Sequence, residues 1–231
     1  MSGVSGPPFP HRTMPLQAVI FDMDGLMIDS EPVQLRATNS ALDPLGVRIA
    51  ETEWAGMVGR RAIDMLADLK SKYGFDADIH DVQRAKNAFY RDLIAREVPP
   101  MPGLYEAIEV CKQAGLRLAL ASSSIREDIS LVLASLHLQQ TFEVIVSGDQ
   151  VTHGKPHPDI FRAAARRLGV PPENCLVLED TAHGIQAAKA AGMFACAVPN
   201  RFTAGQDFRQ ADAVLASLAD LKLALPESPG G

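Results

Sequence analysis

The stretch Ala18-Val19-Ile20-Phe21-Asp22-Met23-Asp24-Gly25 decides the fold of this chain. Four apolar residues lead directly into two carboxylates that flank a single residue, and a glycine follows. An apolar run of this kind is typical of a strand buried on both faces of a parallel sheet. Ligands of open α/β sheets bind at the carboxyl ends of such strands. Taken alone, Asp22 and Asp24 are equally compatible with a plain polar strand end.

Apolar runs and amphipathic helical patterns alternate in the second half of the chain. The further predicted strands cover residues 116–121, 142–146, 175–178, 194–198 and 212–215. A regular alternation of strand and helix predicts a Rossmann-like, mostly parallel sheet with helices on both faces.

Residues 31–98 interrupt this alternation, because they carry helical patterns and no convincing strand. Val82, Lys86, Phe89 and Leu93, for example, include apolar positions at helical spacing. This pattern predicts a helical subdomain inserted into the α/β fold.

The expected domain organisation follows from these boundaries. We expect an α/β core made of residues 14–30 and 99–222, with an α-helical cap over 31–98. Residues 1–13 are rich in Pro, Gly and Ser, lack the apolar centre of a secretory signal, and are expected to form a disordered tail.

Composition excludes several classes of partner. A net charge of −6 over 231 residues argues against a nucleic-acid or anionic-membrane surface. No apolar run approaches the roughly 18 residues that a membrane span needs. Cys111, Cys175 and Cys196 lie in apolar runs without metal-type spacing, and we interpret them as reduced core residues. We therefore expect a cytoplasmic protein, monomeric by default.

Polar residues follow several predicted strands at the same edge of the sheet. These candidates are Asp22, Asp24, Ser122, Ser123, Lys155, Glu179 and Asp180. Carboxylates suit Mg²⁺, which prefers about six oxygen ligands and accepts phosphate oxygens among them. A lysine binds phosphate as a point charge, and backbone N–H groups after a strand supply further donors. The set predicts a site for Mg²⁺ and a phosphate group.

With these motifs, the sequence resembles the haloacid-dehalogenase superfamily, in particular its branch of beta-phosphoglucomutase and phosphoglycolate-phosphatase-like enzymes. The matching motifs occur in the family's order and span residues 16–221. They are Asp22-Met23-Asp24-Gly25, Ser122 after its strand, Gly154-Lys155-Pro156-His157-Pro158-Asp159, and Glu179-Asp180. The inserted helices match the place of the family's cap.

The resemblance implies a phosphoric monoester hydrolase that works in two chemical steps. Asp22 would attack phosphorus and form an aspartyl-phosphate, and Asp24 would protonate the leaving alcohol and then take a proton from water. The implied substrate is a small phosphorylated metabolite, such as a sugar phosphate.

The resemblance also assigns the remaining candidates. The implied Mg²⁺ ligands are the Asp22 side chain, the Asp24 backbone carbonyl and Asp180, with Glu179 as a weaker ligand or a supporting neighbour. Ser122, Ser123 and Lys155 would hold the transferring phosphoryl group. Apart from the resemblance, the place of His157 before Pro158 predicts that it caps a helix.

Two alternatives stay open. A phosphomutase of the beta-phosphoglucomutase type is expected to carry a His four residues after a Ser or Thr at the start of the cap. Here the pair is Ser30 and Gln34, and glutamine cannot relay a proton, so hydrolysis is favoured. A non-catalytic phosphate-binding protein is the second alternative. Arg60 and Arg61 of the cap are candidates for substrate contacts.

Overall fold

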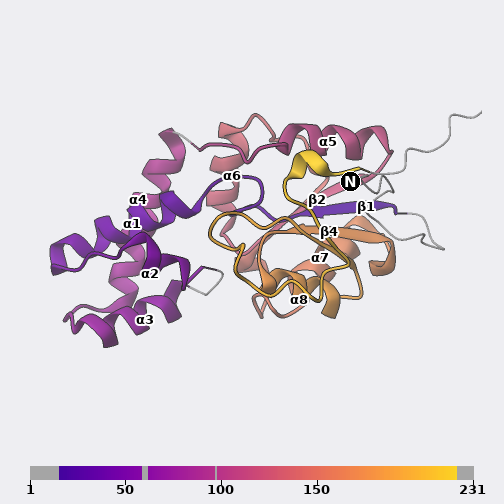
Figure 1. Cartoon of the computed structure of the whole chain (residues 1–231). Coiled ribbons are helices and arrows are strands. Elements are labelled where there is room, and N and C mark those ends of the chain that lie inside the picture. Colours follow the sequence, from indigo (N-terminus) through magenta and orange to yellow (C-terminus); the bar gives the residue numbers. More distant parts are fainter. Residues whose placement is uncertain (1–15, 59–61, 97, 223–231) are drawn as a thin grey trace, which may run out of the picture.

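The computed structural model describes residues 16–58, 62–96 and 98–222. A twisted sheet with helices on both faces lies beside a group of helices, which occupies the left of Figure 1. The predicted tail over 1–13 and the candidate arginines Arg60 and Arg61 lie outside the described residues. Among the described helices, none is long and apolar enough to cross a membrane.

The sheet has six strands in the order β3-β2-β1-β4-β5-β6, and every neighbouring pair is parallel. The strands are β1 (Ala18–Phe21), β2 (Arg117–Ser122), β3 (Val144–Ser147), β4 (Cys175–Glu179), β5 (Phe194–Ala197) and β6 (Ala213–Val214). The predicted α/β fold is confirmed, and the sheet is fully parallel. The central strand β1 pairs with β2 on one side and β4 on the other, so its end lies in the middle of the sheet edge.

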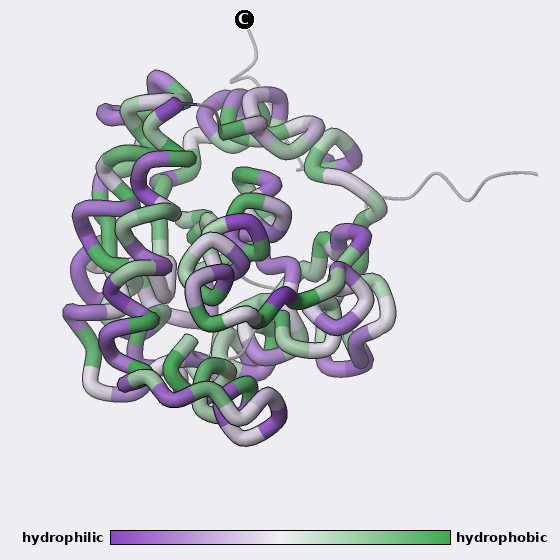
Figure 2. Tube along the Cα trace, turned by 90° about the vertical axis from the view of Figure 1, so that its left-hand side faces the viewer, coloured by the Kyte–Doolittle hydropathy of each residue, from purple (hydrophilic) through white to green (hydrophobic). Residues whose placement is uncertain are grey.

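Helices cover both faces of this sheet because alternate strand residues point to opposite sides. The helices around the sheet are α5 (Leu104–Gln113), α6 (Arg126–Ser135), α7 (Asp159–Leu168) and α8 (Ala182–Ala190). Val19 and Phe21 of β1 pack in one cluster with residues of α5 and α6. Ala18 and Ile20 pack in a second cluster with α7 and α8 on the other face. Along the helical turns in Figure 2 hydrophobic and hydrophilic residues alternate, as expected for helices with one buried face.

The remaining helices form what we call the helical unit. They are α1 (Glu31–Leu42), α2 (Glu51–Ala55), α3 (Ala62–Tyr73) and α4 (Ile79–Arg96). The helical unit has a hydrophobic cluster of its own, which includes Leu42, Trp54, Leu66 and Val82. Phe202, from a loop of the α/β part, completes this cluster and ties the two parts together.

Helix α4 confirms the helical spacing of Val82, Lys86, Phe89 and Leu93. Its buried residues are Val82, Lys86, Tyr90 and Ile94, whereas Phe89 is 43% exposed. The buried stripe of this helix contains a lysine and a tyrosine, and both line a cavity.

Two chain segments connect the helical unit to the α/β part, and they run side by side. The Asp29 N–H donates to the Pro99 carbonyl at 3.1 Å, and the Met101 N–H donates to the Met27 carbonyl at 2.9 Å. These paired connections place the helical unit over the carboxyl edge of the sheet.

Candidate active site

The predicted site residues come from separate elements and meet at the carboxyl edge of the sheet. Asp22 follows β1, Ser122 ends β2, Glu179 ends β4, and Lys155 lies in the loop before α7. A cavity of about 490 Å³ opens beside them and is bounded on its other side by the helical unit. Because parallel strands end at one edge, residues far apart in sequence share one cavity wall.

Lys155 links two of the carboxylates. Its Nζ lies 2.5 Å from Asp22 Oδ1 and 2.7 Å from Glu179 Oε1, and all three residues are almost fully buried. Burial lowers the pKa of Lys155, but the charges of the two carboxylates outweigh it and raise that pKa. Burial also raises the pKa of Asp22 to about 7, against the lowering effect of Lys155. Lys155 therefore stays charged and holds the Asp22 carboxylate in place.

Both oxygens of Glu179 are occupied within the protein. Oε1 accepts from Lys155, and Oε2 accepts from the backbone N–H and the hydroxyl of Thr181, each at 2.8 Å. A Cβ at Gly184 would lie 1.9 Å from this carboxylate, so only glycine leaves room for it. These contacts indicate that Glu179 positions Lys155.

Asp180 has one satisfied oxygen and one that is free. Oδ2 accepts from Asn200 Nδ2 at 2.8 Å, whereas the buried Oδ1 has no hydrogen-bond partner among the described residues. Burial and the neighbouring charges of Glu179 and Asp22 raise the pKa of Asp180 well above its usual range. Gly25 has a φ of +81°, which favours glycine, and a Cβ there would lie 2.2 Å from Asp180 Oδ2. Both the backbone conformation and the lack of space therefore require a glycine in the first motif.

The carboxylates of this site fit a divalent cation. Asp22, Glu179 and Asp180 each offer a carboxylate oxygen, and these oxygens lie within 4.8 Å of one another. A buried carboxylate oxygen without a donor is costly unless a cation or a proton neutralises it. The free Oδ1 of Asp180 therefore fits an oxygen-ligated cation of the kind that Mg²⁺ represents.

Asp24 is surrounded by hydroxyl groups. Its Oδ2 accepts from Ser124 Oγ at 2.7 Å and from Ser122 Oγ at 3.3 Å, and its Oδ1 accepts from Tyr90 Oη at 3.1 Å. Ser122 was predicted to bind phosphate, but here its hydroxyl contacts Asp24 and accepts from the Ser124 N–H. Ser123 is exposed and lines the cavity.

Tyr90 carries no sequence signal of a site residue. A tyrosine within an amphipathic helix resembles an ordinary core residue, and its contact with Asp24 spans 66 residues of sequence. No local signal could have pointed to it.

The helical unit lines the other side of the cavity with polar side chains. Lys86 Nζ donates to Gln34 Oε1 at 2.5 Å, and Trp54 Nε1 donates to Glu31 Oε2 at 2.7 Å. Burial lowers the pKa of Lys86 and raises that of Glu31 to about 7. Gln34 stands where a phosphomutase is expected to carry its relay histidine. Here its side-chain oxygen accepts a hydrogen bond from Lys86.

Two histidines, His157 and His183, lie near the site. The expected capping role of His157 is wrong: α7 begins after Pro158 without a side-chain cap, and His157 Nδ1 lies 3.3 Å from Asp159 Oδ1. His183 lines the main cavity.

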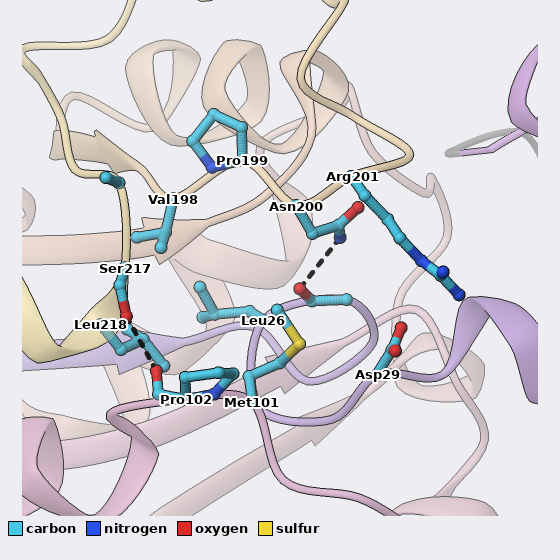
Figure 3. A pocket seen from close by; sticks show the side chains of 12 residues that line it. Leu26, Asp29, Met101, Pro102, Val198, Pro199, Asn200, Arg201, Ser217 and Leu218 are labelled. Atoms are coloured by element: carbon cyan, nitrogen blue, oxygen red, sulfur yellow. Dashed lines mark hydrogen bonds between the residues drawn. The ribbon is translucent and has the colours of Figure 1, made fainter.

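A second cavity, of about 400 Å³, lies behind the connecting segments (Figure 3). Asp29 and Arg201 line it, together with Asn200, whose Nδ2 also donates to the Gly25 carbonyl at 3.0 Å. Asn200 thus lines this cavity and contacts Asp180 as well.

Comparison with known proteins agrees with this geometry. Residues 19–198 match the model of the haloacid dehalogenase-like hydrolases. The chain is 37% identical to hexitol phosphatase B of Escherichia coli, over 88% of this chain and 93% of that protein. It is 34% identical to protein CbbY of Rhodobacter capsulatus, over 94% of this chain and all of that protein.

A solved structure shows the same fold. CbbY from Rhodobacter sphaeroides, in a variant complexed with xylulose-(1,5)bisphosphate, superposes with a TM-score of 0.82 at 30% identity, over 90% of this chain and all of that one. The chain therefore belongs to the haloacid dehalogenase-like hydrolases. Its predicted family and its predicted class, an enzyme that hydrolyses phosphoric monoesters, are both confirmed.

Proposed function

We propose that this protein is a Mg²⁺-dependent phosphatase that hydrolyses a small phosphorylated sugar or a similar phosphomonoester through an aspartyl-phosphate on Asp22. The observation that carries the proposal is the pairing of Asp22 with Lys155 at 2.5 Å, beside the free Oδ1 of Asp180 and the mouth of a 490 Å³ cavity. A buried, lysine-held carboxylate at a cavity wall suits a nucleophile.

Asp22 and Asp24 divide the chemistry between them. Asp22 Oδ2 is free of the lysine and attacks phosphorus, while Asp24 gives a proton to the leaving oxygen. In the second step Asp24 takes a proton from the water that attacks the aspartyl-phosphate. Lys155 offsets the negative charge that gathers around the phosphoryl group, and Ser123, which lines the cavity, offers a further donor.

The residues that would hold Mg²⁺ are the Asp22 side chain, the Asp24 backbone carbonyl and Asp180. When bound, the cation lowers the pKa of Asp22 and neutralises phosphate charge. Glu179 supports this set through Lys155, because both of its oxygens already have donors.

The helical unit is the cap in this proposal and selects the substrate. Its cavity wall offers Lys86, Asn87, Gln34 and Glu31, which suit the hydroxyl groups of a sugar or polyol. Relatives named as a hexitol phosphatase and as a protein complexed with a ketose bisphosphate support this substrate class. A cap over the site also favours small metabolites, because closure excludes water and leaves no room for a macromolecule.

The test is a phosphate-release screen over hexitol phosphates, hexose phosphates and ketose bisphosphates with Mg²⁺, in which isomerised sugar phosphate is followed separately. We expect free phosphate and no isomer. Rapid isomerisation without phosphate release would establish the phosphomutase alternative instead.

Two variants accompany the screen. Asp22→Asn should lower kcat at least about 1,000-fold, because it removes the nucleophile. Asp43→Asn, on an exposed surface position of the helical unit, should keep wild-type activity. Equal activity of wild type and Asp22→Asn would overturn the mechanism.

A further inference from the structure

Helix α4 belongs to two hydrophobic clusters at once. Val82, near its start, packs in the cluster of the helical unit, whereas Tyr90 and Ile94 pack in the cluster of the α/β part. The second half of α4 therefore docks onto the core, next to α6 (Figure 1). An ion pair between Arg91 Nε and Asp128 Oδ1, at 2.6 Å, ties the same half of α4 to α6.

Docking places the Tyr90 hydroxyl on Asp24. Tyr90 is 2% exposed, and its Oη donates to Asp24 Oδ1 at 3.1 Å. The core residues Ser122 and Ser124 donate to the other oxygen, Oδ2. The α/β core thus donates to one oxygen of the Asp24 carboxylate, and the helical unit donates to the other.

A tyrosine hydroxyl suits a residue that changes its protonation state. It can donate to an ionised carboxylate and, after rotation about its C–O bond, accept from a protonated one. A lysine or an arginine at this place could only donate. Tyr90 can therefore keep contact with Asp24 both before and after a proton transfer, and it keeps its own proton throughout.

We propose that Tyr90 is a positioning residue: it orients Asp24 for proton transfer to the leaving oxygen, and it does so only while the cap is docked. The inference rests on the proposed function, because it takes Asp24 as the proton carrier. In the first step the bond from Asp22 to phosphorus forms, the bond from phosphorus to the leaving oxygen breaks, and the Asp24 proton moves to that oxygen. In the second step a water oxygen bonds to phosphorus, the Asp22 bond breaks, and the water's proton moves to Asp24.

The proposal predicts a dependence on the leaving group. An alkoxide from a sugar or polyol phosphate is a poor leaving group and needs a proton as it departs. Nitrophenolate is a stable anion and needs little help. Because kcat/KM reports events up to the first irreversible step, it isolates the transfer in which Asp24 acts as an acid.

The experiment compares wild type with Tyr90→Phe on an alkyl phosphate that the wild type hydrolyses and on p-nitrophenyl phosphate. We expect kcat/KM for the alkyl substrate to fall about 10-fold with KM nearly unchanged, and kcat/KM for the aryl substrate to change less than about 2-fold. Tyr73→Phe is the matched control, because Tyr73 lies in the same helical unit and bonds the surface residue Glu53. It should leave both substrates unaffected.

Equal losses on both substrates would overturn the inference, because a loosened cap slows every substrate alike. No loss on either substrate would overturn it as well. The failure of the proposed function looks different: wild type itself would then release no phosphate, or Asp22→Asn would stay active. Thermal unfolding of Tyr90→Phe within a few degrees of wild type confirms that the variant is folded.

Discussion

Asn200 holds Asp180 in place: its Nδ2 lies 2.8 Å from Asp180 Oδ2, and within the part of the chain that the structure describes the opposite oxygen, Oδ1, is buried without a hydrogen bond. Asn200 also bonds the Gly25 carbonyl, so one amide joins the first motif of the chain to the last. Asp180, held by this contact, offers one carboxylate oxygen to the cluster that it forms with Asp22 and Glu179.

The first prediction concerns this contact. Asn200→Ala should raise the Mg²⁺ concentration for half-maximal activity about 10-fold, because residues that orient metal ligands typically contribute 10- to 100-fold to metal affinity. Activity at saturating Mg²⁺ should stay close to wild type. The control is Asn174→Ala, a buried asparagine just before the opposite end of β4. An unchanged Mg²⁺ requirement in Asn200→Ala would contradict the assignment.

The second prediction separates the roles of the neighbouring acids. Asp180→Asn should raise the Mg²⁺ requirement more than about 10-fold, because it removes a ligand charge. Glu179→Gln should lower kcat with less than about a 3-fold change in the Mg²⁺ requirement, since Glu179 acts through Lys155. If Glu179→Gln instead matched Asp180→Asn in its metal requirement, Glu179 would be a ligand.

The third prediction concerns stability and pH. Burial raises the pKa of Glu31 to about 7, so the fold favours the protonated form. The stabilisation from this group is complete below the unfolded pKa, roughly 4.3, and is lost as pH rises through 7. Glu31→Gln cannot ionise and keeps an acceptor for Trp54. Its unfolding free energy should equal that of wild type at acidic pH and exceed it by up to about 3 kcal/mol at pH 8.

Urea unfolding at pH 4, just below the unfolded pKa, and at pH 8 measures this difference. Glu106→Gln, an exposed substitution of the same kind on α5, provides the control and should show no pH-dependent gain. The same offset between Glu31→Gln and wild type at both pH values would show that Glu31 is ionised throughout.

The fourth prediction concerns Lys86. Within the described residues its hydrogen bond goes to the neutral Gln34, and burial lowers its pKa against the opposing charges of nearby carboxylates, none of which forms an ion pair with it. Lys86→Met should raise KM about 10-fold for a sugar or polyol phosphate, because a buried donor to the substrate is lost. The same change should stabilise the fold by about 1 kcal/mol, since an unpaired buried charge is removed.

Steady-state kinetics and urea unfolding test the two halves of that prediction separately. Lys112→Met, at an exposed position of α5, should change neither quantity. An unchanged KM in Lys86→Met would remove Lys86 from substrate recognition.

The sequence by itself determined the parallel sheet and the edge at which the site lies. Short apolar runs define buried strands locally, and parallel strands necessarily end at the same edge, so Asp22, Lys155, Glu179 and Asp180 could be placed together before their distances were known. The family motifs added the expected roles.

Tertiary structure alone decided which groups each acid contacts. Asn200 approaches Asp180, and Tyr90 approaches Asp24 across 66 residues, through contacts that no local periodicity encodes. The same reason explains what the sequence pattern did not predict. Phe89 is exposed because the buried stripe of α4 carries Lys86 and Tyr90 to the cavity, and the Ser122 hydroxyl bonds Asp24 because the end of β2 lies beside the first motif. His157 contacts Asp159 and does not cap α7. Local sequence specifies elements and their ends, whereas the packing of distant elements decides which partners meet there.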